Sequence, residues 1–193
     1  NFNFIQKSVE DLTDVILDKL EYNVFSGGLT FAQNTVYGYT NHPTAVQTGS
    51  LSYDWSTATG EEVLEDILSI GFAIRVQNVK FEFGQAIMYI PNGWDSKFDD
   101  NYTTNYAQTL RERALALPWL KDIKVSSYCP DDQVVVAFMQ SKYVSLIRGA
   151  GIQPILWRSP DGLSQHIKLM AIEAPLMRSD FNGKKGIFHF TKS

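Results

Sequence analysis

The sequence has few of the residues that build covalent or metal frameworks. Its 193 residues include one cysteine, Cys129, and three histidines. A single cysteine excludes an internal disulfide, and these four residues are too few for a cysteine/histidine metal cluster. Low cysteine usage favours a reducing compartment, which we expect to be the cytoplasm. We therefore predict no disulfide framework, no metal site and no cofactor.

Long hydrophobic runs and an excess of positive charge are also missing. The longest apolar stretch, Val134 to Met139, falls far short of the roughly 20 residues that a membrane-spanning helix needs. Seventeen basic against twenty-one acidic residues give a net charge of -4, the wrong sign for a dedicated nucleic-acid binder. The start, Asn1 to Phe4, lacks the features of a signal peptide, so we expect a fragment or processed product and no membrane partner.

What the sequence does contain is typical of a globular domain, with 44% hydrophobic and 20% charged residues. Apolar spacing predicts helices at about 8–25, 60–78 and 105–117. The first helix has one apolar stripe, formed by Val9, Leu12, Ile16 and Leu20. The second begins at a capping box, Thr59 to Glu62.

Short apolar runs between these helices predict strands. We expect them near Thr35 and over 85–91, 123–127, 133–139, 163–174 and 186–190. The run at Val134 to Val136 is apolar on both faces, which is typical of a central strand. Residues 47–60 are expected to form an exposed linker, and Gly149 to Gly151 a loop between strands. The alternation predicts an α/β or α+β layer in the middle of the chain.

Residues able to carry catalysis are scattered along the sequence. His42 lies in a proline-bounded turn, whereas His166 and His189 fall in expected strands, and the chain has no Gly-x-Ser-x-Gly elbow. Acidic neighbours Asp131 and Asp132 disfavour a reactive thiol at Cys129. No acidic pair has the spacing of a calcium loop. We predict no catalytic residue, and this favours a structural or assembly protein over an enzyme.

An aromatic series with spacings of four follows the second helix. It consists of Trp94, Phe98, Tyr102 and Tyr106. These side chains are candidate subunit contacts, although an edge of the core is the alternative interpretation.

An ordered set of segments covers almost the whole chain and resembles the major capsid proteins of tailed phages with the Hong Kong 97-like fold, in the encapsulin-like branch. The set runs from the first helix through a turn with Gly38, Asn41, His42 and Pro43 to the segments Trp55 to Gly60, Met88 to Pro91, Thr109 to Arg113 and Ala174 to His189. We expect the four turn residues to act in folding. If Gly38 has a positive φ, its replacement by valine is expected to reduce the folded yield.

The resemblance implies an α+β fold with a long spine helix at about 8–25. It implies a peripheral (P) domain from residues 1–55 and 161–193 and an axial (A) domain from residues 56–160. The family's N-terminal arm and extended loop have almost no counterpart before Val9. A truncated subunit is therefore expected, with residues 1–7 as the tail of that loop.

The implied function is that of a viral capsid subunit. Copies of the chain would form pentamers and hexamers of an icosahedral shell, with a scaffolding protein or segment as a further partner. The shell would enclose double-stranded DNA without sequence-specific binding, in a virion assembled in the bacterial cytoplasm.

Two alternatives remain open at this point. One is an encapsulin-type compartment shell of the same fold. The other is a small α/β enzyme, which would need a deep pocket that joins His42, His166 or His189 to an acid and a nucleophile.

Overall fold

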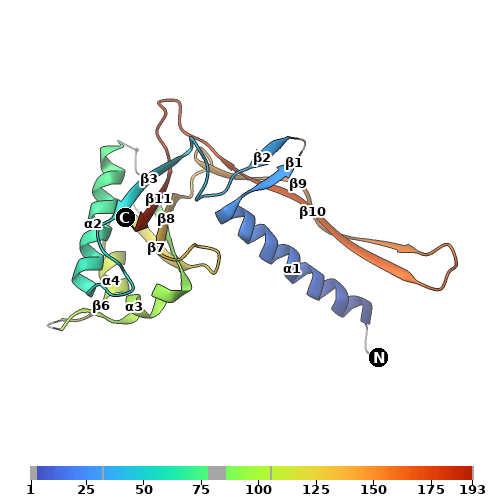
Figure 1. Ribbon diagram of the computed structural model, residues 1–193, viewed down its shortest axis with the longest axis horizontal. Helices are drawn as coiled ribbons and strands as arrows, with labels where there is room; N and C mark the ends of the chain where they lie inside the picture. The colour runs from blue at the N-terminus through green and yellow to red at the C-terminus, as the bar shows by residue number, and fades with distance from the viewer. Residues whose placement is uncertain (1–3, 32, 78–85, 105, 193) are drawn as a thin grey trace. The chain divides into compact units, whose positions relative to one another are not determined.

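The computed structural model describes residues 4–31, 33–77, 86–104 and 106–192 (Figure 1). Its helices are α1 (Phe4–Ser26), α2 (Gly60–Val76), α3 (Asp95–Asp99) and α4 (Leu110–Leu115), with a 3₁₀ turn η1 (Asn92–Trp94). Its strands are β1 (Leu29–Phe31), β2 (Asn34–Val36), β3 (Val46–Leu51), β4 (Ala86–Ile90), β5 (Asn101–Thr103), β6 (Tyr106–Thr109), β7 (Leu120–Val125), β8 (Gln133–Phe138), β9 (Val144–Arg158), β10 (Gln165–Met177) and β11 (Ile187–Lys192).

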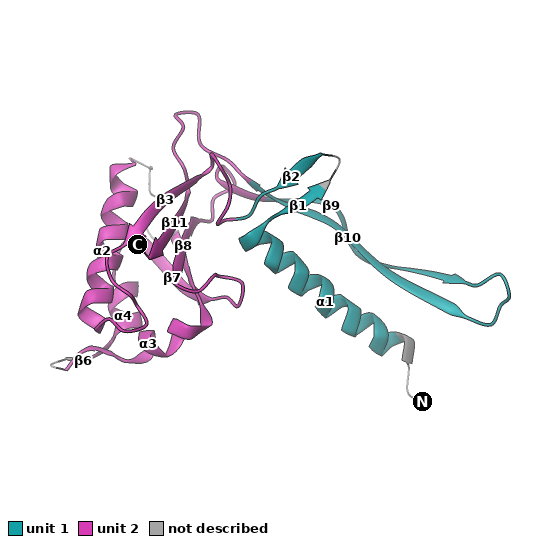
Figure 2. Ribbon diagram, viewed as in Figure 1, with its two compact units in different colours: residues 1–38, 146–176 teal, residues 39–145, 177–193 magenta. Residues whose placement is uncertain are grey.

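The chain divides into two compact units (Figure 2). Unit 1 comprises residues 1–38 and 146–176, and unit 2 comprises residues 39–145 and 177–193. These bounds differ from the expected domain bounds at 55 and 160, because β3 and β11 pair with each other and β11 pairs with β8 in one sheet. The assignment of peripheral and axial domains stays a prediction.

Unit 1 contains the long helix that the sequence predicts. Helix α1 spans 23 residues, begins at Phe4, before the expected residue 8, and ends at Ser26. Gly27 and Gly28 follow with φ of 57° and 87°, left-handed values that glycine adopts without steric cost. Strands β1 and β2 then form a short antiparallel hairpin.

The other part of unit 1 is a long strand pair, β9 and β10. The expected loop at Gly149 to Gly151 is wrong, because these residues lie inside the 15-residue strand β9. A Cβ at Gly149 would lie 3.0 Å from Cγ2 of Ile172 in β10, so this glycine lets the two strands pack closely.

Unit 2 is built on a five-stranded mixed sheet in the order β3-β11-β8-β4-β7. Strand β8 is central, antiparallel to both neighbours, and Val134, Val135 and Val136 are fully buried. The predicted central strand is therefore confirmed. The outer pairs, β3 with β11 and β4 with β7, are parallel.

The exposed linker expected at 47–60 is wrong over its first part. Residues 46–51 form β3, which pairs in parallel with β11. The serines, threonines and Gly49 suggested flexibility, but a Cβ at Gly49 would lie 2.5 Å from the Phe190 ring. The glycine is there to let an aromatic side chain lie over the strand.

Two helices of unit 2, α2 and α4, begin at capping boxes. Thr59 and Glu62 form the predicted capping box, and α2 buries Val63, Ile67, Ile70 and Ile74 against the core. The third predicted helix, 105–117, is shortened to α4 (Leu110–Leu115), because a second capping box at Thr109 and Glu112 starts the helix there. Residues 106–109 instead pair with β5 as strand β6.

The core of unit 2 closes around Trp55, which is fully buried. Its ring centroid lies 5.1 Å from that of Trp94 and 5.8 Å from that of Phe98. The carboxylate of Asp66, 2% exposed, accepts hydrogen bonds from Trp55 Nε1 and from the backbone N–H groups of Ser52 and Tyr53 at 2.9 to 3.1 Å. This carboxylate fixes the connection between β3 and α2.

Candidate functional site

The turn after β2 packs backbone against backbone. A Cβ at Gly38 would lie 2.3 Å from the carbonyl oxygen of Phe25, and a Cβ at Gly27 would lie 2.3 Å from the nitrogen of Gly38. The condition of a positive φ at Gly38 is not met, because its φ lies outside the left-handed range. The need for glycine comes from close approach to the end of α1 instead.

His42 holds the next part of this turn. Its Nδ1 accepts hydrogen bonds from the backbone N–H groups of Ala45 at 3.0 Å and Thr44 at 3.3 Å. Burial, with a smaller effect from Lys185, lowers the pKa of His42. Both effects favour the neutral imidazole, whose Nδ1 serves as the acceptor. Asn41 and Pro43 are exposed neighbours in the same turn, and the importance of these residues for folding stays a prediction.

The other two histidines, His166 and His189, lie in β10 and β11. His166 Nε2 lies 3.1 Å from Ser159 Oγ at the exposed turn of the β9–β10 pair, where Trp157 stacks on the imidazole. His189 Nε2 lies 2.6 Å from Gln133 Oε1, across β11 and β8. The partners of these two histidines are thus a serine hydroxyl and a glutamine amide, and the enzyme alternative stays a prediction.

Cys129 is a buried thiol. Its Sγ lies 3.7 Å from the carbonyl oxygen of Tyr89 and 3.6 Å from that of Gln133. Burial raises the pKa of this thiol to about 12, so the reactive thiolate is scarce at neutral pH. Among the described residues, no three histidine, cysteine, aspartate or glutamate side chains gather as a metal site.

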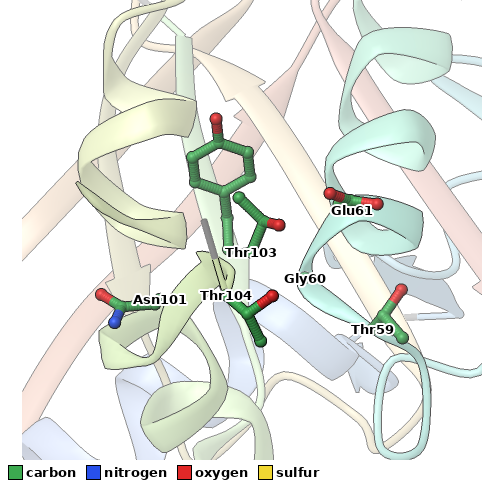
Figure 3. Close-up of a pocket in the computed structure, with 7 residues that line it drawn as sticks. Thr59, Gly60, Glu61, Asn101, Thr103 and Thr104 are labelled. Carbon is green, nitrogen blue, oxygen red and sulfur yellow. The ribbon is translucent and has the colours of Figure 1, made fainter. Parts of the chain in front are cut away.

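A pocket of about 400 Å³ lies at the start of α2 (Figure 3). Thr59 and Glu61 lie on one side, and Asn101, Thr103 and Thr104 lie on the other. The Thr59 hydroxyl already accepts the backbone N–H of Glu62, and the Glu62 carboxylate accepts the N–H of Thr59. The helix terminus is thus capped by its own side chains.

The aromatic series expected at a subunit contact lies mostly in the core. Trp94 is 4% exposed and Phe98 is fully buried, because both rings pack against Trp55. This corrects the prediction for those two residues. Tyr102 is half-buried in β5, and the side chain of Tyr106 lies outside the described part of the chain.

Apolar side chains are exposed on other elements, where the sequence analysis did not place contacts. Leu68, Phe72 and Val76 are 50 to 69% exposed along one face of α2. Strands β9 and β10 expose a second set, Leu146, Ile147, Ile155, Leu156, Trp157 and Ile172. Exposed apolar groups that gather on one face mark interaction surfaces. The spacing of four in the α2 face was visible in the sequence, but its exposure was not.

Solved structures with a similar fold include a phage capsid and a virus-like particle. The capsid of Myoviridae Phage XM1 matches with a TM-score of 0.79 over 100% of this chain and 66% of that chain, at 9% identity. A virus-like particle from Pyrococcus furiosus matches with a TM-score of 0.56 over 76% of this chain and 56% of that chain, at 16% identity. The chain thus spans about two thirds or less of each solved chain.

These matches confirm the expected mixed α+β, capsid-like fold. None of the helices in the described ranges has the length and hydropathy needed to cross a membrane. No curated protein matches the sequence. Residues 2–190 match the model of a family of unknown function, DUF6260. The chain is therefore a member of the family of unknown function DUF6260.

Proposed function

We propose that this chain is a structural subunit that assembles with copies of itself into the shell of a tailed-phage-type virion. The observation that carries the proposal is the match of the whole chain to a phage capsid protein at a TM-score of 0.79. In this proposal the fold is the Hong Kong 97-like fold, α1 is its spine helix, and strands β4, β7 and β8 belong to its axial domain, residues 56–160.

The exposed apolar surfaces support self-association. Side chains such as Phe72 and Leu156 are 69% and 50% exposed, and transfer of such groups from water into a contact is favourable. A subunit that meets its copies through two different surfaces makes heterologous contacts, which close into rings when the rotation angle is fixed. Pentamers and hexamers are the rings we propose, and many modest contacts then stabilise the shell together.

The net charge of the chain agrees with a shell that encloses DNA without binding it tightly. A net charge of -4 disfavours tight binding of phosphate groups, so the proposed interior holds double-stranded DNA without reading its sequence. We propose a scaffolding protein or segment as the further partner that sets curvature during assembly.

A compartment shell of the encapsulin type is the second candidate. It is favoured by the match to a virus-like particle from Pyrococcus furiosus, at a TM-score of 0.56. Both candidates need contacts between copies of the chain, and they differ in what the shell encloses.

Electron microscopy of the protein expressed in bacteria tests the proposal. Closed particles support a shell subunit, and a field of single subunits and amorphous aggregates contradicts it. Particles isolated from the natural source then separate the candidates, because a virion protects a long double-stranded DNA from nuclease, whereas a compartment releases a cargo protein on disassembly.

A further inference from the structure

Helix α2 has an exposed apolar side opposite the side that it buries. The helix lies at the margin of unit 2 (Figure 2). Its buried side chains, which pack against the core of this unit, include Val63, Ile67, Ile70 and Ile74. On the other side Leu68 is 50% exposed and Phe72 is 69% exposed. Apolar groups gathered in this way mark an interaction surface.

Two charged side chains flank this apolar pair. Glu65 precedes it and Arg75 follows it along the helix, and both are exposed. We call these four residues, Glu65, Leu68, Phe72 and Arg75, the α2 face. At 3.6 residues per turn they lie within about 80° of arc around the helix axis. One partner surface can therefore contact all four at once.

The α2 face is symmetric about Ile70. Leu68 and Phe72 lie two residues to either side of Ile70, and the two charged residues lie five residues to either side. Consider two copies packed antiparallel around a two-fold axis at this residue. Leu68 of each copy then lies opposite Phe72 of the other. Glu65 lies opposite Arg75 in the same way, about 7 Å from the axis at 1.5 Å of rise per residue.

The charges favour the antiparallel arrangement. A parallel pair would place Glu65 beside Glu65 and Arg75 beside Arg75, and like charges repel. Glu61, one turn earlier, adds to the negative charge at its end of the helix. The Tyr53 hydroxyl donates to Glu65 Oε2 at 3.1 Å, but a carboxylate accepts several hydrogen bonds. Glu65 can therefore bind a guanidinium as well.

From this symmetry and these charges we infer that the α2 face of one copy packs antiparallel against the α2 face of a second copy. Two apolar pairs form the centre of the contact, and a Glu65–Arg75 ion pair closes each end. The inference rests on the proposed function, in which copies of the chain contact one another, and it names one contact. The same patch is used on both copies, so the contact is isologous and closes with two copies.

The exposed side chains of β9 and β10 match the α2 face less well. These strands carry three lysine and arginine residues against one glutamate, which already pairs with Arg148. Their remaining cations attract Glu65 but repel Arg75. A second α2 face satisfies both charges, so it is the occupant that the charges select.

The contact is weak by itself. Each copy contributes two apolar and two charged side chains, which is less than the roughly 800 Å² per partner of a stable interface. Weak contacts stabilise an assembly when each subunit makes several of them. The α2 contact therefore joins subunits in pairs, and rings need a different surface of the chain.

Disulfide formation between two variants tests the contact and its direction. Glu65→Cys is made in one chain, and Arg75→Cys is made in a second chain with a tag of different mass. In the antiparallel pair the two thiols lie opposite each other, and the remaining Glu65–Arg75 ion pair is kept. Mild oxidation is expected to give the mixed dimer at about ten times the yield of either single-variant dimer, because docking raises the effective concentration of the thiols. The native Cys129 is buried and stays out of the reaction.

Two controls accompany this experiment. Lys121→Cys replaces Glu65→Cys, since Lys121 is an exposed residue of β7 in the same unit. Phe72→Ala is added to both chains of the original pair. This change removes the centre of the contact but concerns a side chain that is 69% exposed, so the fold is kept. Both controls are expected to remove the excess of mixed dimer.

Charge reversal gives a second readout. Arg75→Glu places like charges at both ends of the pair and is expected to weaken self-association about tenfold in sedimentation equilibrium. The double variant Glu65→Arg/Arg75→Glu restores opposite charges and is expected to regain the wild-type affinity. A double variant as weak as the single variant would overturn the charge pairing.

The outcomes separate this contact from the proposed function. An excess of mixed dimer that Phe72→Ala removes supports the contact, even if the wild type forms no closed particle. A statistical mixture of the three dimers, or an excess of the single-variant dimers, overturns it. If the wild type still forms particles in that case, the shell function stands, and if the wild type stays monomeric, both proposals fail.

Discussion

The carboxylate of Asp66 accepts the indole N–H of Trp55 at 2.9 Å, and both residues are almost completely buried. The same carboxylate accepts two backbone N–H groups, so three donors depend on one side chain. A charged group is stable in a protein interior only with such partners. The pair joins the segment after β3 to the middle of α2.

Replacement of Asp66 by alanine is expected to destabilise unit 2 severely. It leaves the buried indole N–H of Trp55 and two part-buried backbone N–H groups without this acceptor, at a cost of about 3 kcal/mol or more. Urea unfolding followed by tryptophan fluorescence measures the loss. Ser69→Ala, an exposed change on the same helix, is the control and is expected to stay within about 0.5 kcal/mol of the wild type. Equal midpoints for the two variants would contradict the role of Asp66.

Replacement of Gly38 by alanine tests the close approach of two backbones. The new Cβ would lie 2.3 Å from the carbonyl oxygen of Phe25, and overpacking of this kind costs about 1 to 3 kcal/mol. Gly93→Ala is the matched control, because nothing lies within 4 Å of its Cβ position. In thermal unfolding we expect a lower midpoint for Gly38→Ala and an unchanged or higher midpoint for Gly93→Ala.

Phe98 tests whether the aromatic series belongs to the core or to a contact. Phe98 is fully buried, so Phe98→Ala is expected to lower the free energy of unfolding by about 3 to 5 kcal/mol. Phe72, 69% exposed on α2, serves as the comparison, and Phe72→Ala is expected to change the subunit's stability by less than about 0.5 kcal/mol. A stable Phe98→Ala subunit would restore the contact interpretation.

The ion pair between Asp54 and Lys192 predicts a dependence of stability on pH. Hydrogen bonds from Lys192 and Ser56 lower the pKa of Asp54 to about 2. Because the folded pKa lies below the unfolded value, this contribution is present above pH 3.8 and is lost as the pH falls toward 2.

The Asp54→Asn variant isolates this effect. Its unfolding midpoint in urea should lose the part of the acid dependence that the wild type shows between pH 4 and pH 2. Asp161→Asn, an exposed aspartate on another turn, should keep the wild-type profile. Identical profiles for the wild type and Asp54→Asn would show that the pair adds no stability.

Local signals predicted the elements that depend on local chemistry. The capping box at Thr59 and Glu62 located the start of α2, and the apolar run at Val134 to Val136 identified the central strand. In each case neighbouring residues determine the geometry, so the pattern is visible in the sequence.

Elements that depend on distant partners were missed. Strand β3 exists because it pairs with β11, about 140 residues later in the chain, and Gly49 makes room for Phe190 there. The same holds for Gly149 against Ile172 in β9 and β10. A glycine in a sequence does not reveal whether it permits a turn or a close contact.

The candidate contact surfaces were predictable only in part. The stripe from Val9 to Leu20 was visible as a periodic pattern, but periodicity cannot show that Leu12 stays 39% exposed. Burial depends on what packs against the stripe. For the same reason, the spacing of Trp94 and Phe98 suggested a subunit contact, whereas both side chains pack in the core.

Sedimentation velocity of the purified protein over a range of concentrations tests most directly the claim that the chain assembles with its own copies. The account predicts discrete boundaries much faster than a monomer, with a large fraction that grows with concentration. A single monomer boundary at every concentration would contradict it.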